Sequence, residues 1–423
     1  MNYRVAGLQP STYEQITIGM HNGRRLYYHL RHGGRRLSVG TPVTKPYRDH
    51  APSDWRAPII APLGVIPIPE HLTRAIRWLC KAQDAVSGGG LSYGYKLGTG
   101  WLPPYPETTG YCIPTLLAYS ELVKDLSYVH RAERMAKWIM RVQLPCGGIR
   151  GGCYSINSSS PAMSFDTGQA LHGLCAMYEA SENMQFLDAA LKAGDWLIEH
   201  QRPDGSWEDL SPGRTRRTRF AFNARTGFSL LYLWRLSRYQ RFHNCAVMHL
   251  AWVRSLQATN GWFSSNGFSP NELPLTHTIA YTLEGLVRCS VILADVSLLT
   301  LAKKASDPLM YFFLEHSQLP AYFDSDWASR GTFQCVTGCA QMALIWHLLD
   351  AMDPSAELRL AASRMLAILK KWQISSAKDD LHGGFMGSFP VAGNYETFTL
   401  PNWGVKFFCD ALLASMKPLR PAS

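Results

Sequence analysis

The sequence contains no apolar run of about 18 residues, the length that an ordinary transmembrane helix needs. The opening segment, MNYRVAGLQPSTYEQITIGM, also lacks the apolar run of about seven residues and the cleavage signature of a signal peptide. We therefore expect a soluble, cytoplasmic protein without a membrane span, and export by another route stays open.

Zinc-type ligand spacing is also missing. The chain has ten cysteines, but most of them lie in apolar, helix-like sequence, which is typical of reduced, buried thiols. Cys335 and Cys339 are four residues apart, yet no His/Cys pair with zinc spacing accompanies them. We expect neither a metal ion nor a cofactor.

Acidic residues are in the minority. The chain has 42 Lys and Arg against 32 Asp and Glu, which gives a formal net charge of +10. Such an excess favours an acidic partner, and no nucleic-acid-binding motif is present. The run RTRRTR (214–219), which includes Arg217, is suited to steer an anionic polymer other than nucleic acid. The sequence does not predict an oligomeric state.

What the sequence does contain is a repeat of about 58 residues, present six times. In each copy an apolar, helix-like stretch ends at a Gln and a turn with Gly or Asp follows. These residues are Gln83, Gln143, Gln201, Gln257, Gln318 and Gln373. A second apolar helix then begins, as in ETTGYC and FDTGQA. One hairpin cannot bury its own apolar face, so the repeat predicts an all-α (α/α)6 toroid over residues 69–423.

Charge separates the two helices of each hairpin. The charged, outer helices are predicted at 70–83, 128–143, 185–201, 241–257, 298–316 and 355–373. The nearly uncharged, inner helices are predicted at 108–124, 166–181, 224–238, 277–292, 335–350 and 402–416. The long loops all run from an outer to an inner helix. We therefore expect a concave site at that end of the toroid, where the inner helices begin.

Residues 1–68 form a different segment. They contain eight arginines and short alternating stretches such as RRLYYHLRH and RRLSVGTPV. This pattern predicts a short, irregular or β-containing extension, which is a basic arm that is extended or folded as a β-hairpin.

Two segments carry a resemblance to known families. HQRPDGSWED (200–209) resembles the Gln-Trp repeat of squalene–hopene cyclases and protein prenyltransferases, and SLQATNGWF (255–263) is a looser copy. The cyclase branch depends on a DxDD motif, whereas FDSDW (323–327) supplies only Asp324 and Asp326. The Asp/Cys/His zinc set of the prenyltransferases cannot be assembled.

More broadly, the repeats over about residues 69–416 resemble the α/α-toroid superfamily, which includes sugar epimerases, polysaccharide lyases and six-hairpin glycoside hydrolases. The resemblance to the carbohydrate-active branch implies cleavage or epimerisation of a uronic-acid-containing, anionic polysaccharide, as in bacterial exopolysaccharide metabolism. A terpenoid-cyclase-like toroid and a non-catalytic toroid that binds glycans or proteins remain alternatives.

Aligning the six inner helices reveals a ring of mostly polar residues on one turn. The ring consists of Thr108, Asp166, Arg225, His277, Val336 and Asn402. Four residues later, on the same helix face, stand Cys112, Ala170, Ser229, Tyr281, Ala340 and Lys406. Because buried, unpaired polar groups are costly, we expect the first ring to meet solvent or a ligand.

For a uronate lyase or C5-epimerase, His277 and Tyr281 can divide the base and acid roles, since they lie one turn apart. Arg225, with Asn223, is suited to bind and neutralise the uronate carboxylate. Substrate contacts are also predicted for Asn402 and Lys406 in the last repeat.

A glycoside hydrolase is the alternative chemistry. It needs two carboxyl groups about 5–10 Å apart, and Asp166 with Glu107, Asp324 or Asp326 could supply them. Glu396 lies on the same face. Three tryptophans are predicted either to stack on sugar rings at the rim or to join neighbouring hairpins: Trp207, Trp262 and Trp327.

Overall fold

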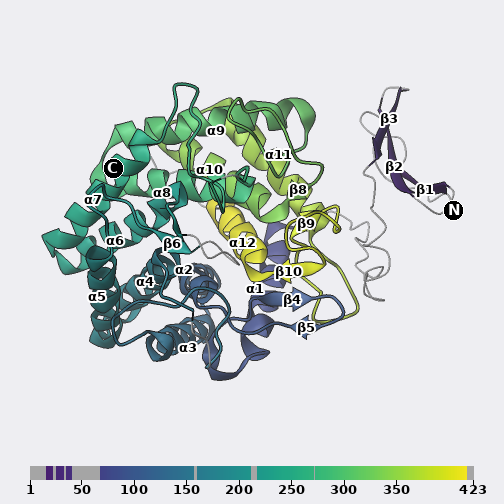
Figure 1. The fold of residues 1–423 in the computed structure, drawn as a ribbon. Coiled ribbons are helices and arrows are strands. Elements are labelled where there is room, and N and C mark those ends of the chain that lie inside the picture. Colours follow the sequence, from purple (N-terminus) through teal and green to yellow (C-terminus); the bar gives the residue numbers. More distant parts are fainter. Residues whose placement is uncertain are drawn as a thin grey trace.

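Twelve α-helices form a closed ring of six hairpins in a computed structural model that describes residues 16–21, 25–32, 35–40, 67–156, 160–210, 217–270 and 272–416 (Figure 1). The outer helices are α1 (Ile68–Asp84), α3 (Ser127–Val142), α5 (Met184–Glu199), α7 (Gln240–Ser255), α9 (Val296–His316) and α11 (Ala356–Trp372). The inner helices are α2 (Pro106–Val123), α4 (Ser164–Ser181), α6 (Ala224–Ser237), α8 (Thr276–Leu293), α10 (Val336–Met352) and α12 (Asn402–Met416).

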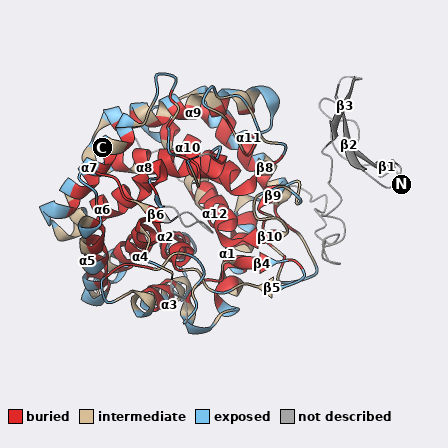
Figure 2. Ribbon diagram, in the orientation of Figure 1, coloured by how far each residue is buried: buried red, intermediate tan, exposed pale blue. Residues whose placement is uncertain are grey.

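Each inner helix contacts the inner helices on either side, and α12 contacts α2, which closes the ring. The twelve helices begin and end within two residues of the predicted bounds, and the α/α-toroid prediction is confirmed. Burial follows the predicted division, because the inner helices are buried over most of their length while the outer helices keep an exposed face (Figure 2). No helix in the described part of the chain is long and apolar enough to cross a membrane.

The repeated glutamines join neighbouring hairpins. In the third hairpin, Gln201 Nε2 donates to the carbonyl of Gly205 in its own turn (3.1 Å) and to the carbonyl of Cys245 in the next outer helix (2.8 Å). Equivalent pairs of bonds are made by Gln83, Gln143, Gln257 and Gln373. Gln318 departs from this pattern and is exposed.

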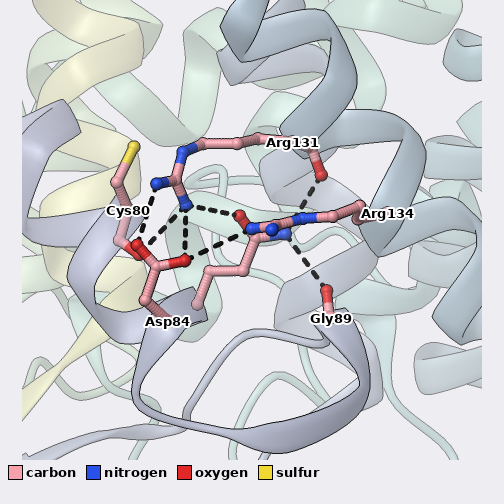
Figure 3. Close-up of polar contacts among 6 residues, drawn as sticks. Cys80, Asp84, Gly89, Arg131 and Arg134 are labelled. Carbon is pink, nitrogen blue, oxygen red and sulfur yellow. Dashed lines mark hydrogen bonds and ion pairs between the residues drawn. The ribbon is translucent and has the colours of Figure 1, made fainter.

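Figure 3 shows the junction between the first two outer helices, α1 and α3. Asp84 accepts two hydrogen bonds from the Arg131 guanidinium, at 2.9 and 2.8 Å, and a third from Arg134 at 3.3 Å. These ion pairs lower the pKa of Asp84, and Arg131 is the first cause. The same junction includes the Gly89 carbonyl that accepts from Gln83. Polar contacts therefore hold adjacent hairpins in register at the periphery.

The turn glycines bring each turn against the next outer helix. Gly205 has φ +88°, and a Cβ atom there would lie 2.3 Å from the Met248 carbonyl oxygen. Gly261 repeats this at φ +89°, with the Lys304 carbonyl oxygen at 2.4 Å. Only glycine fits such a conformation at so short a distance, which explains why Gly follows the repeated Gln.

Short strands occur in the long loops that precede inner helices. One small sheet has the order β10-β4-β5, from Thr399–Pro401, Gly94–Lys96 and Gly100–Trp101, and so joins the last repeat to the first. Two antiparallel pairs are β6 (Asp209–Leu210) with β7 (Arg217–Thr218), and β8 (Gln334–Cys335) with β9 (Ser388–Phe389).

The described N-terminal residues form an antiparallel sheet of three strands, β1 (Ile16–His21), β2 (Arg25–His32) and β3 (Arg35–Gly40). The extension therefore contains β-structure, as its alternating pattern predicted. The rest of the arm, and residues 214–216 of the basic run, lie outside the described residues.

Candidate active site

A cavity of about 680 Å³ opens at the end of the toroid where the inner helices begin. Nine aromatic residues line it, from the loops and from the first turns of the inner helices: Tyr93, Tyr105, Phe165, Phe220, Phe222, Phe268, Tyr281, Tyr395 and Trp403. Its polar side chains include one imidazole and five carboxyl groups: His277, Glu107, Asp166, Asp209, Glu272 and Glu396. An apolar, concave wall with a few convergent titratable groups is typical of a small-molecule site.

Asp166 lies in the first turn of α4 and faces this cavity. It is only 6% exposed, and its Oδ1 accepts no hydrogen bond from the described residues. Capping of the helix falls to Asp209 in β6, whose Oδ1 accepts from the Ser164 amide at 2.8 Å. Asp209 also accepts from the Phe165 amide at 3.3 Å. Asp166 is therefore not needed as the cap of the helix, although backbone hydrogen bonds from Gly152 and from its own amide act on its carboxyl group.

The second carboxyl group, Glu107, comes from the first turn of α2, where Pro106 starts the helix. The Tyr105 hydroxyl donates to Glu107 Oε2. Tyr105 in turn stacks on Tyr93, with ring centroids 5.5 Å apart. The glutamate is therefore held in place by aromatic residues that themselves form the cavity wall.

Burial perturbs both carboxyl groups in the same direction. It is the main cause that raises the pKa of Asp166 well above its usual range, and the neighbouring charges of Glu107 and Asp209 add to it. Burial also raises the pKa of Glu107 to about 7, although the Tyr105 hydroxyl and the charge of Arg225 oppose the shift. Two carboxyl groups that disfavour each other's charge retain a proton near neutral pH.

His277 lies at the start of α8 with its ring against Tyr281, at a centroid distance of 4.4 Å. Its Nδ1 is 2.7 Å from Gln341 Oε1 in α10. Because that oxygen can only accept, Nδ1 carries the proton and Nε2 keeps its lone pair. Burial lowers the pKa of His277 to about 4, so the imidazole is neutral at pH 7. The residue is therefore a neutral base at the cavity wall.

Arg225 lies beneath the cavity lining. It is 1% exposed, and its Nη1 donates to Glu284 Oε2 at 2.5 Å while its Nε donates to Gln169 Oε1 at 3.1 Å. The guanidinium also lies 5.0 Å from the centroid of the Tyr281 ring. Burial alone would raise the pKa of Glu284, but Arg225 and other cations lower it to about 2. This buried ion pair already occupies the fork that a substrate carboxylate was predicted to use.

Three further polar residues of the predicted set are outside the cavity lining and engaged by other residues of the protein. Asn402 Nδ2 donates to the Ser92 carbonyl (2.6 Å) and to Thr108 Oγ1 (2.8 Å). Lys406 Nζ pairs with Asp410 at 2.6 Å. Asn223 Nδ2 donates to Ser164 Oγ at 3.1 Å. Of the first aligned ring, Asp166 and His277 therefore line the cavity, whereas Asn402 Nδ2 donates to Thr108 and Asn402 Oδ1 has no partner among the described residues.

The predicted tryptophan platforms lie outside the cavity lining. Trp207 is 1% exposed, and its Nε1 donates to the Leu197 carbonyl at 2.8 Å, which joins the loop to α5. Trp262 and Trp327 pack edge to face at 5.1 Å.

The remaining predicted groups are also elsewhere. Arg217 is exposed in β7 and donates to the Glu208 carbonyl at 3.1 Å. Asp324 forms an ion pair with Arg330 at 2.6 Å in an exposed turn, and Asp326 is exposed beside it. Glu107 is therefore the one predicted partner of Asp166 that shares its cavity.

Sequence reasoning missed several lining residues, among them Tyr105, Asp209, Tyr395 and Trp403. Two of them had a signal, because Tyr105 and Trp403 lie within two residues of an inner-helix start. Asp209 and Tyr395 come from loops that differ among the repeats, so aligning the copies could not find them.

No protein-family model and no curated protein matches the sequence. Solved structures match it in fold. A sugar epimerase from a ruminal bacterium superposes with a TM-score of 0.68 at 12% identity, over 83% of this chain and 98% of that chain. The unsaturated glucuronyl hydrolase of Bacillus sp. GL1 superposes with a TM-score of 0.65 at 15% identity, over 83% and 97% of the two chains.

The unsaturated glucuronyl hydrolase of Streptococcus agalactiae is a third match, with a TM-score of 0.60 at 15% identity, over 84% of this chain and 93% of that chain. This protein is thus similar in fold to α/α-toroid carbohydrate-active enzymes. At these identities the likeness concerns the fold, and what the cavity does has to be argued from its own residues.

Proposed function

We propose that the protein is a carbohydrate-active enzyme that hydrolyses a glycosidic bond, with Asp166 as the proton donor. The observation that carries this proposal is the pair Asp166 and Glu107 in one aromatic-lined cavity, with Asp166 Oδ1 buried and unpartnered among the described residues. A sugar ring suits the wall, because its C–H faces pack on aromatic rings while its hydroxyl groups bond to carboxyl oxygens.

The two carboxyl groups divide the reaction between them. Asp166, kept protonated by burial, donates its proton to the glycosidic oxygen as the bond from that oxygen to the anomeric carbon breaks. A water molecule adds to the anomeric carbon and transfers its proton to the Glu107 carboxylate. The hydroxyl groups of Tyr105 and Tyr281 and the positive charge of Arg225 all favour the ionised form of Glu107, which suits this residue to the base role.

The comparisons support this choice. Two structures of the S. agalactiae hydrolase carry Asp-to-Asn substitutions at positions that are 60 residues apart in its numbering, and one further structure with the second substitution holds dGlcA-GalNAc6S. In this chain Glu107 and Asp166 are 59 residues apart, on consecutive inner helices. A similar spacing on the same fold is consistent with a similar pair of acids.

The proposed substrate is an anionic oligosaccharide or polysaccharide, as the net charge of +10 predicted. Basic side chains lie beside lining residues at the mouth. Arg150 Nη1 donates to the Ser160 carbonyl at 2.7 Å, and the charge of Lys96 acts on Glu396. Positive charge at this place attracts the part of a polyanion that stays outside the cavity.

Proton abstraction by His277 is the second candidate, for a lyase or an epimerase. The observation that favours it is the neutral imidazole, whose Nδ1–H bond to Gln341 leaves Nε2 free to act as a base. Tyr281 is the neighbouring acid. One observation counts against this candidate: Arg225, which was predicted to bind the uronate carboxylate, is engaged by Glu284 beneath the cavity lining.

One experiment separates the candidates. The protein is incubated in deuterated buffer with a panel of oligosaccharides, and reducing ends, ultraviolet absorbance and deuterium in the sugar are followed together. New reducing ends with flat absorbance support hydrolysis. Growing absorbance from unsaturated uronates supports elimination, and deuterium without new reducing ends supports epimerisation. Asp166→Asn and His277→Gln should each abolish one chemistry, whereas Asp324→Asn, which removes a carboxylate from an exposed turn, serves as the control.

A further inference from the structure

Glu396 is a further carboxyl group of the cavity lining, and the proposed hydrolysis does not use it. It lies in the loop between β9 and β10, lines the cavity, and accepts a hydrogen bond from the Tyr93 hydroxyl through Oε1. The residue is only partly buried.

The backbone around Glu396 is strained. Glu396 has φ +49° and Phe398 has φ +57°, a region that non-glycine residues rarely adopt. Packing fixes this conformation, because the Glu396 Cβ lies against Gly387, where a Cβ on the glycine would come within 2.3 Å of it. Backbone strain of this kind persists where the surrounding structure over-determines it, and it clusters at functional sites.

Aromatic rings connect Glu396 to the catalytic pair. Tyr93 bonds to Glu396 and stacks on Tyr105, which bonds to Glu107. Trp403 packs edge to face on Tyr93 at 4.6 Å and completes this part of the wall. Glu396 and Glu107 are thus held by adjacent members of one aromatic stack, and both line the cavity.

These carboxyl groups disfavour the binding of a sugar ring that itself carries a carboxylate. A ring carboxylate placed inside the cavity would be repelled at low effective dielectric by the ionised base Glu107 and by Glu396. Burial raises the pKa of Glu396, but the Tyr93 hydroxyl and the charge of Lys96 favour its ionised form. Hydroxyl groups would instead donate to the open carboxyl oxygens and satisfy them. The requirement applies to the ring inside the cavity and leaves the charge of the polymer outside it unrestricted.

We infer that Glu396 is a specificity-determining residue that selects an uncharged, hydroxyl-bearing sugar ring over a uronate in the cavity. This inference rests on the proposed function, since it names the ring that the acid pair would act on. It also sets this chain apart from the unsaturated glucuronyl hydrolases that it matches in fold.

The test compares matched pairs of p-nitrophenyl glucosides and glucuronides, in both anomeric forms, as a ratio of kcat/KM. The wild-type protein should prefer the glucoside. Glu396→Gln, which keeps an acceptor for Tyr93, should shift the ratio toward the glucuronide by about tenfold or more, because one negative charge is removed. Glu396→Ala should shift it in the same direction. The control, Asp326→Asn, removes an exposed carboxylate outside the cavity lining and should leave the ratio nearly unchanged.

A preference of the wild-type protein for glucuronides, or an unchanged ratio in both Glu396 variants, would overturn the inference. If no glycoside is cleaved, the proposed function fails, but the inference can still be tested by binding. Glucose-terminated and glucuronate-terminated disaccharides are then titrated into the folded wild-type and Glu396→Gln proteins and followed by NMR. The inference is supported if the wild-type protein binds the glucose-terminated sugar more tightly and if this difference in affinity is smaller in the Glu396→Gln variant. It is refuted if the wild-type protein binds the glucuronate-terminated sugar more tightly.

Discussion

Replacing Glu107 with Gln should stabilise the protein at high pH while impairing its activity. Burial raises the pKa of this carboxyl group from 4.5 to about 7. Between these two values the folded protein keeps a proton that the unfolded chain releases, so stability falls as the pH rises through this window. The glutamine side chain of the variant does not ionise, so the variant would not lose this part of the free energy of unfolding as the pH rises.

The size of the effect follows from the shift. One pKa unit corresponds to about 1.4 kcal/mol, so the shift of Glu107 costs about 3 kcal/mol once the pH exceeds 7. Below about pH 4.5 the cost is absent, because both states are then protonated. With an unfolding entropy of about 2.1 cal/mol/K per residue, a toroid of about 350 residues converts this into a change in melting temperature of about 4 °C.

The assay is thermal unfolding of wild-type and Glu107→Gln protein at pH 5 and pH 8, at one scan rate. The melting temperature of the variant relative to wild type should increase by about 3 to 4 °C between the two pH values. Glu199→Gln, which removes an exposed carboxylate at the end of α5, is the matched control and should show no such change. If the difference in melting temperature between Glu107→Gln and wild type is the same at pH 5 and pH 8, the argument that burial of the ionised Glu107 is costly is refuted.

Three further outcomes are expected. Asp166→Asn should lower kcat by about 10²- to 10⁴-fold, the usual contribution of a general acid, and leave oligosaccharide binding measurable by calorimetry. Glu284→Gln should destabilise the fold by about 3–5 kcal/mol in denaturant unfolding, since it leaves the buried Arg225 and the neighbouring Arg288 without their shared carboxylate. Gly261→Ala should lower the melting temperature, because its Cβ would meet the Lys304 carbonyl oxygen at 2.4 Å, and an unchanged value would contradict the steric reason for the turn glycines.

The repeat made the fold predictable. Each of the six copies contributes one charged and one nearly uncharged helix, and both kinds of helix have a periodicity that the sequence shows directly. In the structure each outer helix packs on the inner helix that precedes it, and α1 packs on α12. Closure of the ring followed from the number of copies. The Gln residues could be recognised as a repeated signal, but their role in bridging two carbonyl groups depends on the position of the next outer helix.

The candidate site was only partly predictable. Asp166, Glu107 and His277 were named because inner-helix starts must gather at one end of the toroid, and all three line the cavity. The same alignment also named Arg225, which lies one layer deeper and pairs with Glu284. Helix periodicity gives the face on which a residue lies, but not the depth at which a long side chain ends.

By itself, the sequence determined the twelve helices, their division into inner and outer rings and the end of the toroid that carries the cavity, because these depend on local periodicity and on the number of repeats. The tertiary structure alone decided which polar groups are left for a ligand. Asp209 caps α4 from a distant loop and leaves Asp166 Oδ1 unpartnered among the described residues, while Asn402 Nδ2 donates to Thr108 Oγ1 across the closure of the ring. Whether a buried polar group faces a ligand depends on partners far away in the chain, and those partners are set only when the ring closes.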